Sequence, residues 1–214
     1  MPLLKELKNA SVFVVARNFN PSIFTQQWLI NKNVIDEGDS DGQQIFTPQF
    51  VHVSNNRFRL TVLPEQLIFE TENSPEETFV EIVNTKLTLI INALNETPFV
   101  AVGVNFQWHV IDTEQNIGGV SKSLFDKGTG IYSLFSTEDA RYGAYMSKDF
   151  LNARLKLDIK PIIDQNNDDK KEFIMPAFNF HRDLSSDKKE EELFEMIEKC
   201  GLFLEESKKI VDKL

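Results

Sequence analysis

Apolar and polar residues alternate through much of the first half of the chain, a pattern that predicts β-strands. Ser11–Arg17 is a short, β-branched, apolar run, typical of a strand buried on both faces. From Phe46 to Glu72 apolar residues recur at every second position, with Asn55-Asn56 and Pro64-Glu65 where turns are needed. We therefore expect one buried strand followed by an antiparallel meander.

Two helices are predicted around this meander. Asn20 can cap a short helix after the first strand, with Pro21 at its first position. Ser74–Glu77, "SPEE", is a capping box that opens a second helix, and Pro98 prevents the helix from continuing. Its apolar residues recur at helical spacing and should cover one face of the sheet: Phe79, Val83, Leu87, Ile90 and Leu94.

The second half begins with a long alternating strand in "FVAVGVNFQWHVID". Every second residue from Val102 to Val110 is large and apolar, so one face of this strand should lie in the core. Three further strands are expected at Tyr142–Met146, Ala153–Ile159 and Phe173–Phe180. The segment between residues 113 and 130 has no clear period, although "SKSLFDKG" is compatible with a helical turn.

A long terminal helix is predicted from about Asp187 to Leu214. Apolar residues along it recur in alternating steps of four and three, which is a heptad pattern. This stripe can pack on the protein's own sheet, or it can contact a second copy or a partner helix. The residues that would form such an interface are Leu193, Ile197, Leu204, Val211 and Leu214.

Together these elements predict an α+β fold, with largely antiparallel sheet covered by amphipathic helices. We divide the chain into residues 1–112 and 113–214, two halves of one continuous domain. "GVNFQWHVID" at 103–112 and "AFNFHRDL" at 177–184 both place Asn-Phe ahead of a histidine and an aspartate. This similarity suggests a pseudo-duplicated arrangement.

Composition and charge narrow the classes of function. The chain carries 33 acidic and 23 basic residues, a net charge of -10, which opposes direct binding to nucleic acid. No apolar run is long enough to span a membrane, and the start lacks the apolar segment of a signal peptide, so we expect a cytoplasmic protein. The single cysteine, Cys200, cannot form an internal disulfide.

Metal and cofactor sites are weakly supported. The acidic segment Asp36–Gln44 offers hard oxygen ligands but lacks the spacing of a calcium loop. His52, His109 and His181 all fall on predicted strands and could hold a metal only if the fold brought them together. The glycine pairs match no phosphate-binding or dinucleotide-binding pattern, and we assign no metal or cofactor.

Catalysis is the less favoured interpretation. His109 and Asp112 are three positions apart on a strand, so their side chains should point to opposite faces. His181 and Asp183 would share a face, but at a junction where Asp183 suits a turn. Cys200 lies on the apolar stripe of the last helix, where a thiol is buried and inert. No catalytic residue is assigned.

One polar surface remains unexplained. It combines the polar faces of the two similar strands and comprises Asn105, Gln107, His109, Asn179 and His181. Two functions are compatible with the whole pattern. The first is a non-enzymatic interaction module that docks onto a partner or a second copy through a sheet edge or the terminal helix. The alternative is a small-molecule-binding or hydrolytic domain with a pocket between helix and sheet, which would gather several of these residues around one cavity.

Three short motifs resemble a family of proteins. They are Asn18-Phe19-Asn20-Pro21, Thr97-Pro98 followed by Ala101–Asn105, and "AFNFHRD" at 177–183 ahead of a terminal amphipathic helix. In these motifs and in the order of its elements the chain resembles a sporadically distributed family of uncharacterised bacterial proteins. The resemblance implies the same fold pattern and an accessory role, such as in a phage-defence or mobile-element cassette. It carries over no catalytic residue.

Overall fold

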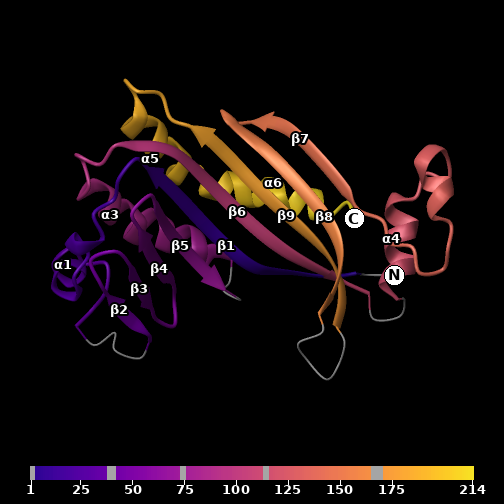
Figure 1. The fold of residues 1–214 in the computed structure, drawn as a ribbon, viewed down its shortest axis with the longest axis horizontal. Helices are drawn as coiled ribbons and strands as arrows, with labels where there is room; N and C mark the ends of the chain where they lie inside the picture. Colours follow the sequence, from indigo (N-terminus) through magenta and orange to yellow (C-terminus); the bar gives the residue numbers. More distant parts are fainter. Residues whose placement is uncertain (1–2, 38–41, 73–75, 113–115, 165–170) are drawn as a thin grey trace.

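A single curved antiparallel sheet organises the molecule (Figure 1). The computed structural model describes residues 3–37, 42–72, 76–112, 116–164 and 171–214. Within these residues the sheet has nine strands in the order β2-β3-β4-β5-β1-β6-β9-β8-β7. The strands are β1 (Leu4–Ala16), β2 (Gln44–Phe46), β3 (Val51–Ser54), β4 (Arg59–Leu63), β5 (Gln66–Glu72), β6 (Phe99–Ile111), β7 (Ala144–Phe150), β8 (Ala153–Asp164) and β9 (Lys171–Asp183).

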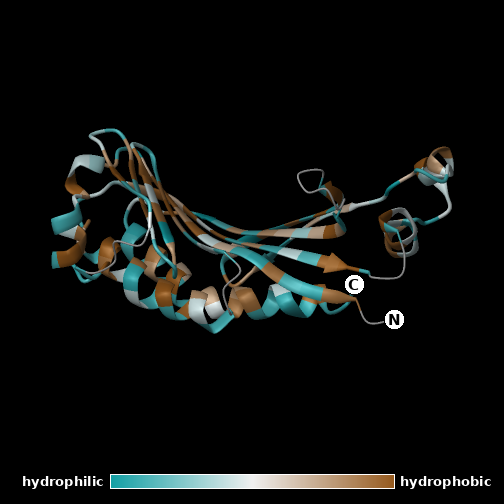
Figure 2. Ribbon diagram, turned by 90° about the horizontal axis from the view of Figure 1, so that it is seen from below, coloured by the Kyte–Doolittle hydropathy of each residue, from teal (hydrophilic) through white to brown (hydrophobic). Residues whose placement is uncertain are grey.

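Helices line one face of this sheet, and the opposite, concave face is left uncovered (Figure 2). The helical elements are η1 (Pro21–Ile23), α1 (Gln26–Asn31), α2 (Glu76–Ile82), η2 (Val83–Leu87), α3 (Thr88–Asn92), α4 (Ile117–Phe125), η3 (Gly130–Phe135), α5 (Lys189–Glu198) and α6 (Cys200–Val211). Helices α5 and α6 both pack on β6, while α4 and η3 stand beyond one end of the strands. The fold is therefore mixed α+β, as the sequence predicts.

The core lies between the helices and the sheet. Alternate residues of β6 point into it, from Val102 to Val110, and none of these side chains is more than 3% exposed. Phe106 meets Phe79 of α2 and Phe180 of β9 in edge-to-face contacts. The period-two pattern thus correctly identified the buried face of this strand, because a pleated strand sends alternate side chains to opposite faces.

The first strand differs from its prediction in length and in burial. β1 begins at Leu4, well before Ser11, and pairs with both β5 and β6. Val12 and Val14 are fully buried under the helices, whereas Phe13 and Val15 lie partly exposed on the uncovered face. The expectation of burial on both faces is therefore wrong, because helices cover only one side of the sheet.

The meander and the two predicted helices of the first half are present. Strands β2 to β5 pair in sequence order, and the apolar helical residues from Phe79 to Leu94 are buried. A π-helical turn, η2, interrupts the regular α-helix between α2 and α3. Asn20 does cap a first turn, but that turn is the 3-10 helix η1, and α1 begins afterwards with Thr25 as its own cap.

Some expectations fall outside the described residues. Ser74 and Pro75 of the predicted capping box do so, although α2 begins directly after them at Glu76. Residues 38–41 of the acidic segment do so as well. The segment without a clear period contains α4, which Asn116 caps by accepting a hydrogen bond from the backbone N–H of Gly119.

The predicted long terminal helix is in fact two helices, α5 and α6, separated at Lys199. Both helices pack on β6, one on each side of this break. The candidate interface residues Leu193, Ile197, Leu204 and Val211 are at most 4% exposed. The heptad stripe therefore packs on the protein's own sheet. Leu214 is partly buried against the same core.

Among the described residues, no helix is long and apolar enough to cross a membrane.

Candidate functional site

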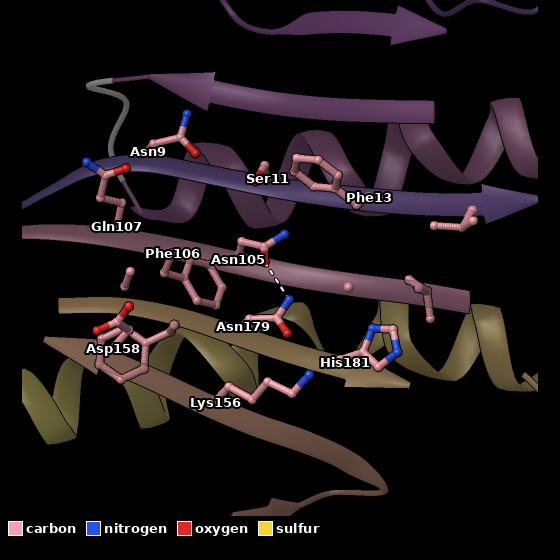
Figure 3. A pocket seen from close by; sticks show the side chains of 15 residues that line it. Asn9, Ser11, Phe13, Asn105, Phe106, Gln107, Lys156, Asp158, Asn179 and His181 are labelled. Atoms are coloured by element: carbon pink, nitrogen blue, oxygen red, sulfur yellow. Dashed lines mark hydrogen bonds between the residues drawn. The ribbon is translucent and has the colours of Figure 1, made fainter. Parts of the chain in front are cut away.

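The uncovered face contains a hollow of about 600 Å³ near the centre of the sheet (Figure 3). Its floor is formed by four neighbouring strands, β1, β6, β9 and β8. These strands carry polar side chains that point away from the helices and toward the viewer of Figure 3. The labelled polar residues are Asn9, Ser11, Asn105, Gln107, Lys156, Asp158, Asn179 and His181.

The strand registers arrange these side chains in rows that cross the sheet. In one row Ser11 pairs with Asn105, Asn105 with Asn179, and Asn179 with Lys156. Because neighbouring strands are about 4.8 Å apart, the row spans about 14 Å. The parallel row beside it runs from Asn9 through Gln107 and Ala177 to Asp158. The floor is therefore a grid of carboxamides with one cation and one anion at the β8 side.

Hydrogen bonds hold part of this grid in place. Asn179 Nδ2 donates to Asn105 Oδ1 at 2.7 Å, and Gln107 Nε2 lies 3.1 Å from Met175 Sδ. Gly103 lies beside this pair, and a Cβ atom there would be 3.2 Å from Asn179 Nδ2. The missing side chain at Gly103 thus leaves open space next to the carboxamides, and any larger residue would fill part of the hollow.

Four of the five residues of the predicted polar face line this hollow: Asn105, Gln107, Asn179 and His181. The fifth, His109, is on the same face of β6 but lies farther along the strand. Its ring stacks on the ring of Phe173, with centroids 3.7 Å apart and planes at 18°. Burial lowers the pKa of His109, and the positive charge of Lys8 lowers it further, while Glu6 and Asp164 act in the opposite direction.

His181 stands between this hollow and a second one. The second hollow, of about 610 Å³, lies at the end of the sheet where β8 begins and β9 ends, and Arg154 and Arg182 contribute to it. His181 Nε2 lies 3.1 Å from Asp183 Oδ1, so the two share a face as expected. The uncovered face therefore has neutral carboxamides in the first hollow and charged side chains, such as Arg154, in the second.

An ion-pair network supports the charged end of this face. Arg182 pairs with Glu192 and Glu195 of α5, and Glu195 also accepts from Lys199 and from Asn152. The hydrogen bonds from Lys199 and Arg182 lower the pKa of Glu195 to about 2. These contacts tie α5 to β9 and to the turn between β7 and β8.

The histidines do not converge. His52 lies on β3 and hydrogen-bonds Thr61 of β4, whereas His181 is on β9, with four strands between. His181 pairs with Gly103 of β6, and His109 lies six residues farther along the same strand, so these two histidines are also apart. Within the described part of the chain, no group of three His, Cys, Asp or Glu side chains is placed to hold a metal ion.

The remaining candidate for chemistry is Cys200, which is fully buried on α6. Burial raises the pKa of its thiol far above the usual range, because the apolar surroundings disfavour the thiolate. Its Sγ lies 3.7 Å from the backbone carbonyl oxygen of Met196. The thiol is thus part of the core, as the sequence indicates.

Sequence reasoning missed the part of the hollow contributed by β1 and β8. Asn9, Ser11 and Phe13 alternate with the core-facing residues of β1, although Ser11 is itself only 2% exposed, and Lys156 and Asp158 alternate with the buried residues of β8. The alternation assigns Lys156 and Asp158 to a solvent-facing side, whereas the run from Ser11 was expected to be buried on both faces. Neither pattern indicates that β1 and β8 flank β6 and β9. That neighbourhood depends on strand order.

The chemistry of the lining is recognition by hydrogen bonding. A carboxamide both donates and accepts hydrogen bonds, and it does not gain or lose a proton near neutral pH. Phe13 and Val15 add apolar surface on the β1 side. A ligand with mixed donors and acceptors and some apolar surface fits this arrangement.

Comparison of the chain with models of known protein families found no match, and a search of curated proteins found no similar sequence.

Proposed function

We propose that this chain is a non-enzymatic binding subunit, and that the uncovered concave face receives an extended segment of a protein partner. The observation that carries the proposal is the carboxamide-lined hollow of about 600 Å³ on a sheet face that none of the described helices covers. Binding sites are typically concave and combine apolar surface with a few polar groups that fix orientation. The central hollow has both properties.

The choice of a polypeptide rests on hydrogen-bond chemistry and dimensions. A peptide main chain presents one donor and one acceptor per residue, which is the combination that Asn and Gln side chains satisfy. The row from Ser11 to Lys156 spans four strands, or about 14 Å, and an extended chain rising about 3.3 Å per residue crosses that distance in about four residues. Lys156 would add charge selectivity at one end, whereas Asp158 already pairs with Lys160.

Electrostatics favour a protein over a polyanion. The net charge of -10 opposes a phosphate backbone, and the lining of the hollow includes one lysine and one aspartate rather than a cluster of cations. The resemblance to sporadically distributed bacterial proteins extends the proposal to an accessory role in the cytoplasm, such as within a phage-defence or mobile-element cassette. Genes adjacent to the one that encodes this chain would test that part.

A photo-crosslinking experiment tests the location of the partner. A photoreactive phenylalanine analogue is placed at Phe13, which lines the hollow, or at Leu202, which is 46% exposed on α6 on the helical side. Irradiation of host cells that produce each variant is expected to give a defined protein adduct at Phe13 and none at Leu202. Adducts at Leu202 alone, or at neither position, would contradict the proposal.

A second variant tests whether the hollow itself is used. Gly103→Val places a branched side chain beside Asn179 and fills part of the space, while suiting a β-strand. We expect the Phe13 adduct to be reduced at least severalfold in this background, and circular dichroism would verify that the variant keeps its fold although Asn179 must shift. An undiminished adduct would place the partner elsewhere on the face.

A small polar molecule is the second candidate, because the hollow falls within the range of about 300 to 1,000 Å³ typical of small-ligand pockets. Native mass spectrometry of the chain purified from its host would then detect a bound molecule that Gly103→Val removes. A protein adduct at Phe13 would therefore support the protein partner, and a bound small molecule in the mass spectrum would support the second candidate.

We also propose that the fold is a pseudo-symmetric pair of halves. The first half starts at β1 and the second at β6, and each contains a central strand, a short helix, a meander and a terminal helical layer. β1 and β6 are neighbours at the middle of the sheet. This order favours a division just before Phe99 rather than after Asp112. In this arrangement the hollow lies across the junction of the halves.

A further inference from the structure

Strand β7 forms one edge of the sheet and has β8 as its single described neighbour (Figure 1). Its seven residues pair with β8 without a register shift, from Ala144 opposite Ile159 to Phe150 opposite Ala153. Tyr145 is 65% exposed and Met146 is 49% exposed. An edge strand of this kind offers a row of outward-facing backbone donors and acceptors to another strand.

The usual devices that protect a sheet edge are weak here. Strand β7 contains no proline, and its two charged side chains are drawn back onto their own chain. Lys148 Nζ contacts Glu206 Oε1 of α6 at 2.5 Å, and Asp149 Oδ1 accepts from Arg154 Nη1 at 3.0 Å. Both side chains thus have partners in their own chain, but they remain 53% and 85% exposed, so a second strand would still meet their charges.

An apolar hollow of about 310 Å³ adjoins this edge on the helical side of the sheet. Met146 lines it together with Leu155 and Leu157 of β8 and Ile210 of α6. Side chains of a strand added beside β7 would lie along this hollow, because added strands continue the alternation of faces. The edge thus combines a backbone with no described partner on its outer side and apolar surface to cover.

We propose that β7 is a self-association surface on which the β7 strand of a second copy pairs antiparallel, centred on Ser147. A two-fold axis perpendicular to the sheet relates two such strands, so each pair of opposed residues comes from the same face. Centring on Ser147 uses all seven residues and opposes Tyr145 with Asp149 and Met146 with Lys148.

Charge selects this register over its neighbours. If the pairing were centred on Lys148, the two copies of Lys148 would lie opposite each other, and if it were centred on Asp149, the two copies of Asp149 would. Directly opposed like charges destabilise a strand pair. Moving the centre one residue toward the N-terminus would leave the end of β7 unpaired. The edge is therefore complementary to itself at Ser147. The uncovered faces of both copies then lie on the same side of one larger sheet.

The test exploits the position of Ser147 on the two-fold axis. Because Arg154 Nη2 donates to Ser147 Oγ at 2.7 Å and would neutralise an aspartate there, the variants are made in an Arg154→Gln background. In that background Ser147→Asp and Ser147→Lys each oppose like charges across the axis, whereas mixing the two variants opposes Asp with Lys. Sedimentation equilibrium at physiological salt, which screens the overall charge of -10, should give twice the chain mass for the unsubstituted protein. It should give a single-chain mass for each variant alone and twice the chain mass for the equimolar mixture.

Matched controls separate the interface from general effects of charge. Ser147 is exposed, as is Ser22 of η1 at the far side of the sheet, and Ser22→Asp and Ser22→Lys should stay dimeric. Met146→Lys, which opposes a lysine to Lys148, is a second disruptive variant at a half-exposed position that should not impair folding. Circular dichroism would verify the fold of every variant.

Three results would overturn the proposal. The first is a single-chain mass for the unsubstituted protein at every concentration. The second is a Ser147→Asp variant that remains dimeric. A Leu134→Asp variant that is monomeric at the same time would place the interface on η3, where Leu134 is 80% exposed. The third is a mixture of the two Ser147 variants that does not associate although each alone is monomeric.

Discussion

At the scale of single residues, neighbours on the same strand face occupy different environments. Gln107 lies in the open hollow, while His109, two positions on, is covered by the ring of Phe173. Burial disfavours the charged imidazolium and lowers the pKa of His109. His109 therefore packs as a flat aromatic side chain against Phe173 in this part of the face.

This environment predicts a pH dependence of stability. Because the pKa of His109 is lower in the folded state than the usual value of about 6.5 in the unfolded chain, the unfolded chain binds more protons between these two values. The contribution of His109 to the free energy of unfolding should therefore fall as pH decreases below about 6.5 and level off below the folded pKa. Urea unfolding between pH 7.5 and pH 5 would measure it.

The control compares two histidine variants. His109→Gln should flatten this part of the pH profile, while His181→Gln should retain it. If both variants kept the profile of the unsubstituted protein, burial of His109 would not be its cause.

At the scale of elements, the helical layer is joined to the sheet by both apolar packing and one buried hydrogen bond. Trp108 of β6 donates from Nε1 to Ser207 Oγ of α6 at 3.1 Å, and both residues are at most 3% exposed. Ser207 Oγ in turn donates to the carbonyl oxygen of Leu204. A serine on an otherwise apolar stripe thus satisfies an indole N–H that would be costly to bury alone.

Removing that partner should destabilise the protein. Ser207→Ala leaves the indole N–H of Trp108 buried without its acceptor, and we expect a loss of about 1 to 3 kcal/mol in the free energy of unfolding. In a double-mutant cycle with Trp108→Phe, the added cost of Ser207→Ala should be smaller, because the donor is gone. Ser123→Ala, at an exposed serine of α4, is the matched control and should change stability little. Strictly additive effects of the two substitutions would contradict the coupling.

At the scale of the whole molecule, central strands have more neighbours than edge strands, so stability should differ across the sheet. β1 and β6 are each flanked by strands on both sides and pair with each other over most of their length. β2 and β7 have one described neighbour each. The centre of the sheet, which carries the hollow, is therefore its most constrained part.

Amide hydrogen exchange should reveal this gradient. We expect the slowest exchange for the buried residues Val12, Val14, Val102 and Val104 at the centre, and the fastest for β2 and β7. The measurement is best made on the Ser147→Asp variant, in which the proposed pairing of β7 is disfavoured. Uniform protection from centre to edge would show that the sheet opens only as a single cooperative unit.

Much of the fold was predictable because strand and helix periods are local. The alternation from Val102 to Val110 identified the buried face of β6, and the helical spacing from Phe79 to Leu94 identified the helix above it. The break at Lys199 was missed because the apolar stripe continues through it, although Gly201, a poor helix former, lies two residues beyond it. The partial exposure of Phe13 was missed for a similar reason, because an apolar run does not indicate how many faces are covered.

By itself the sequence determined which side chains share a strand face, and hence that Asn105, Gln107 and His109 form one polar set. Tertiary structure alone decided which strands are neighbours, so that Asn179 joins Asn105, β1 and β8 complete the hollow, and His109 lies outside it. The physical reason is that side-chain direction follows from the local pleat, whereas strand order and register come from pairings between residues far apart in the chain. The same non-local pairing left β7 as an edge.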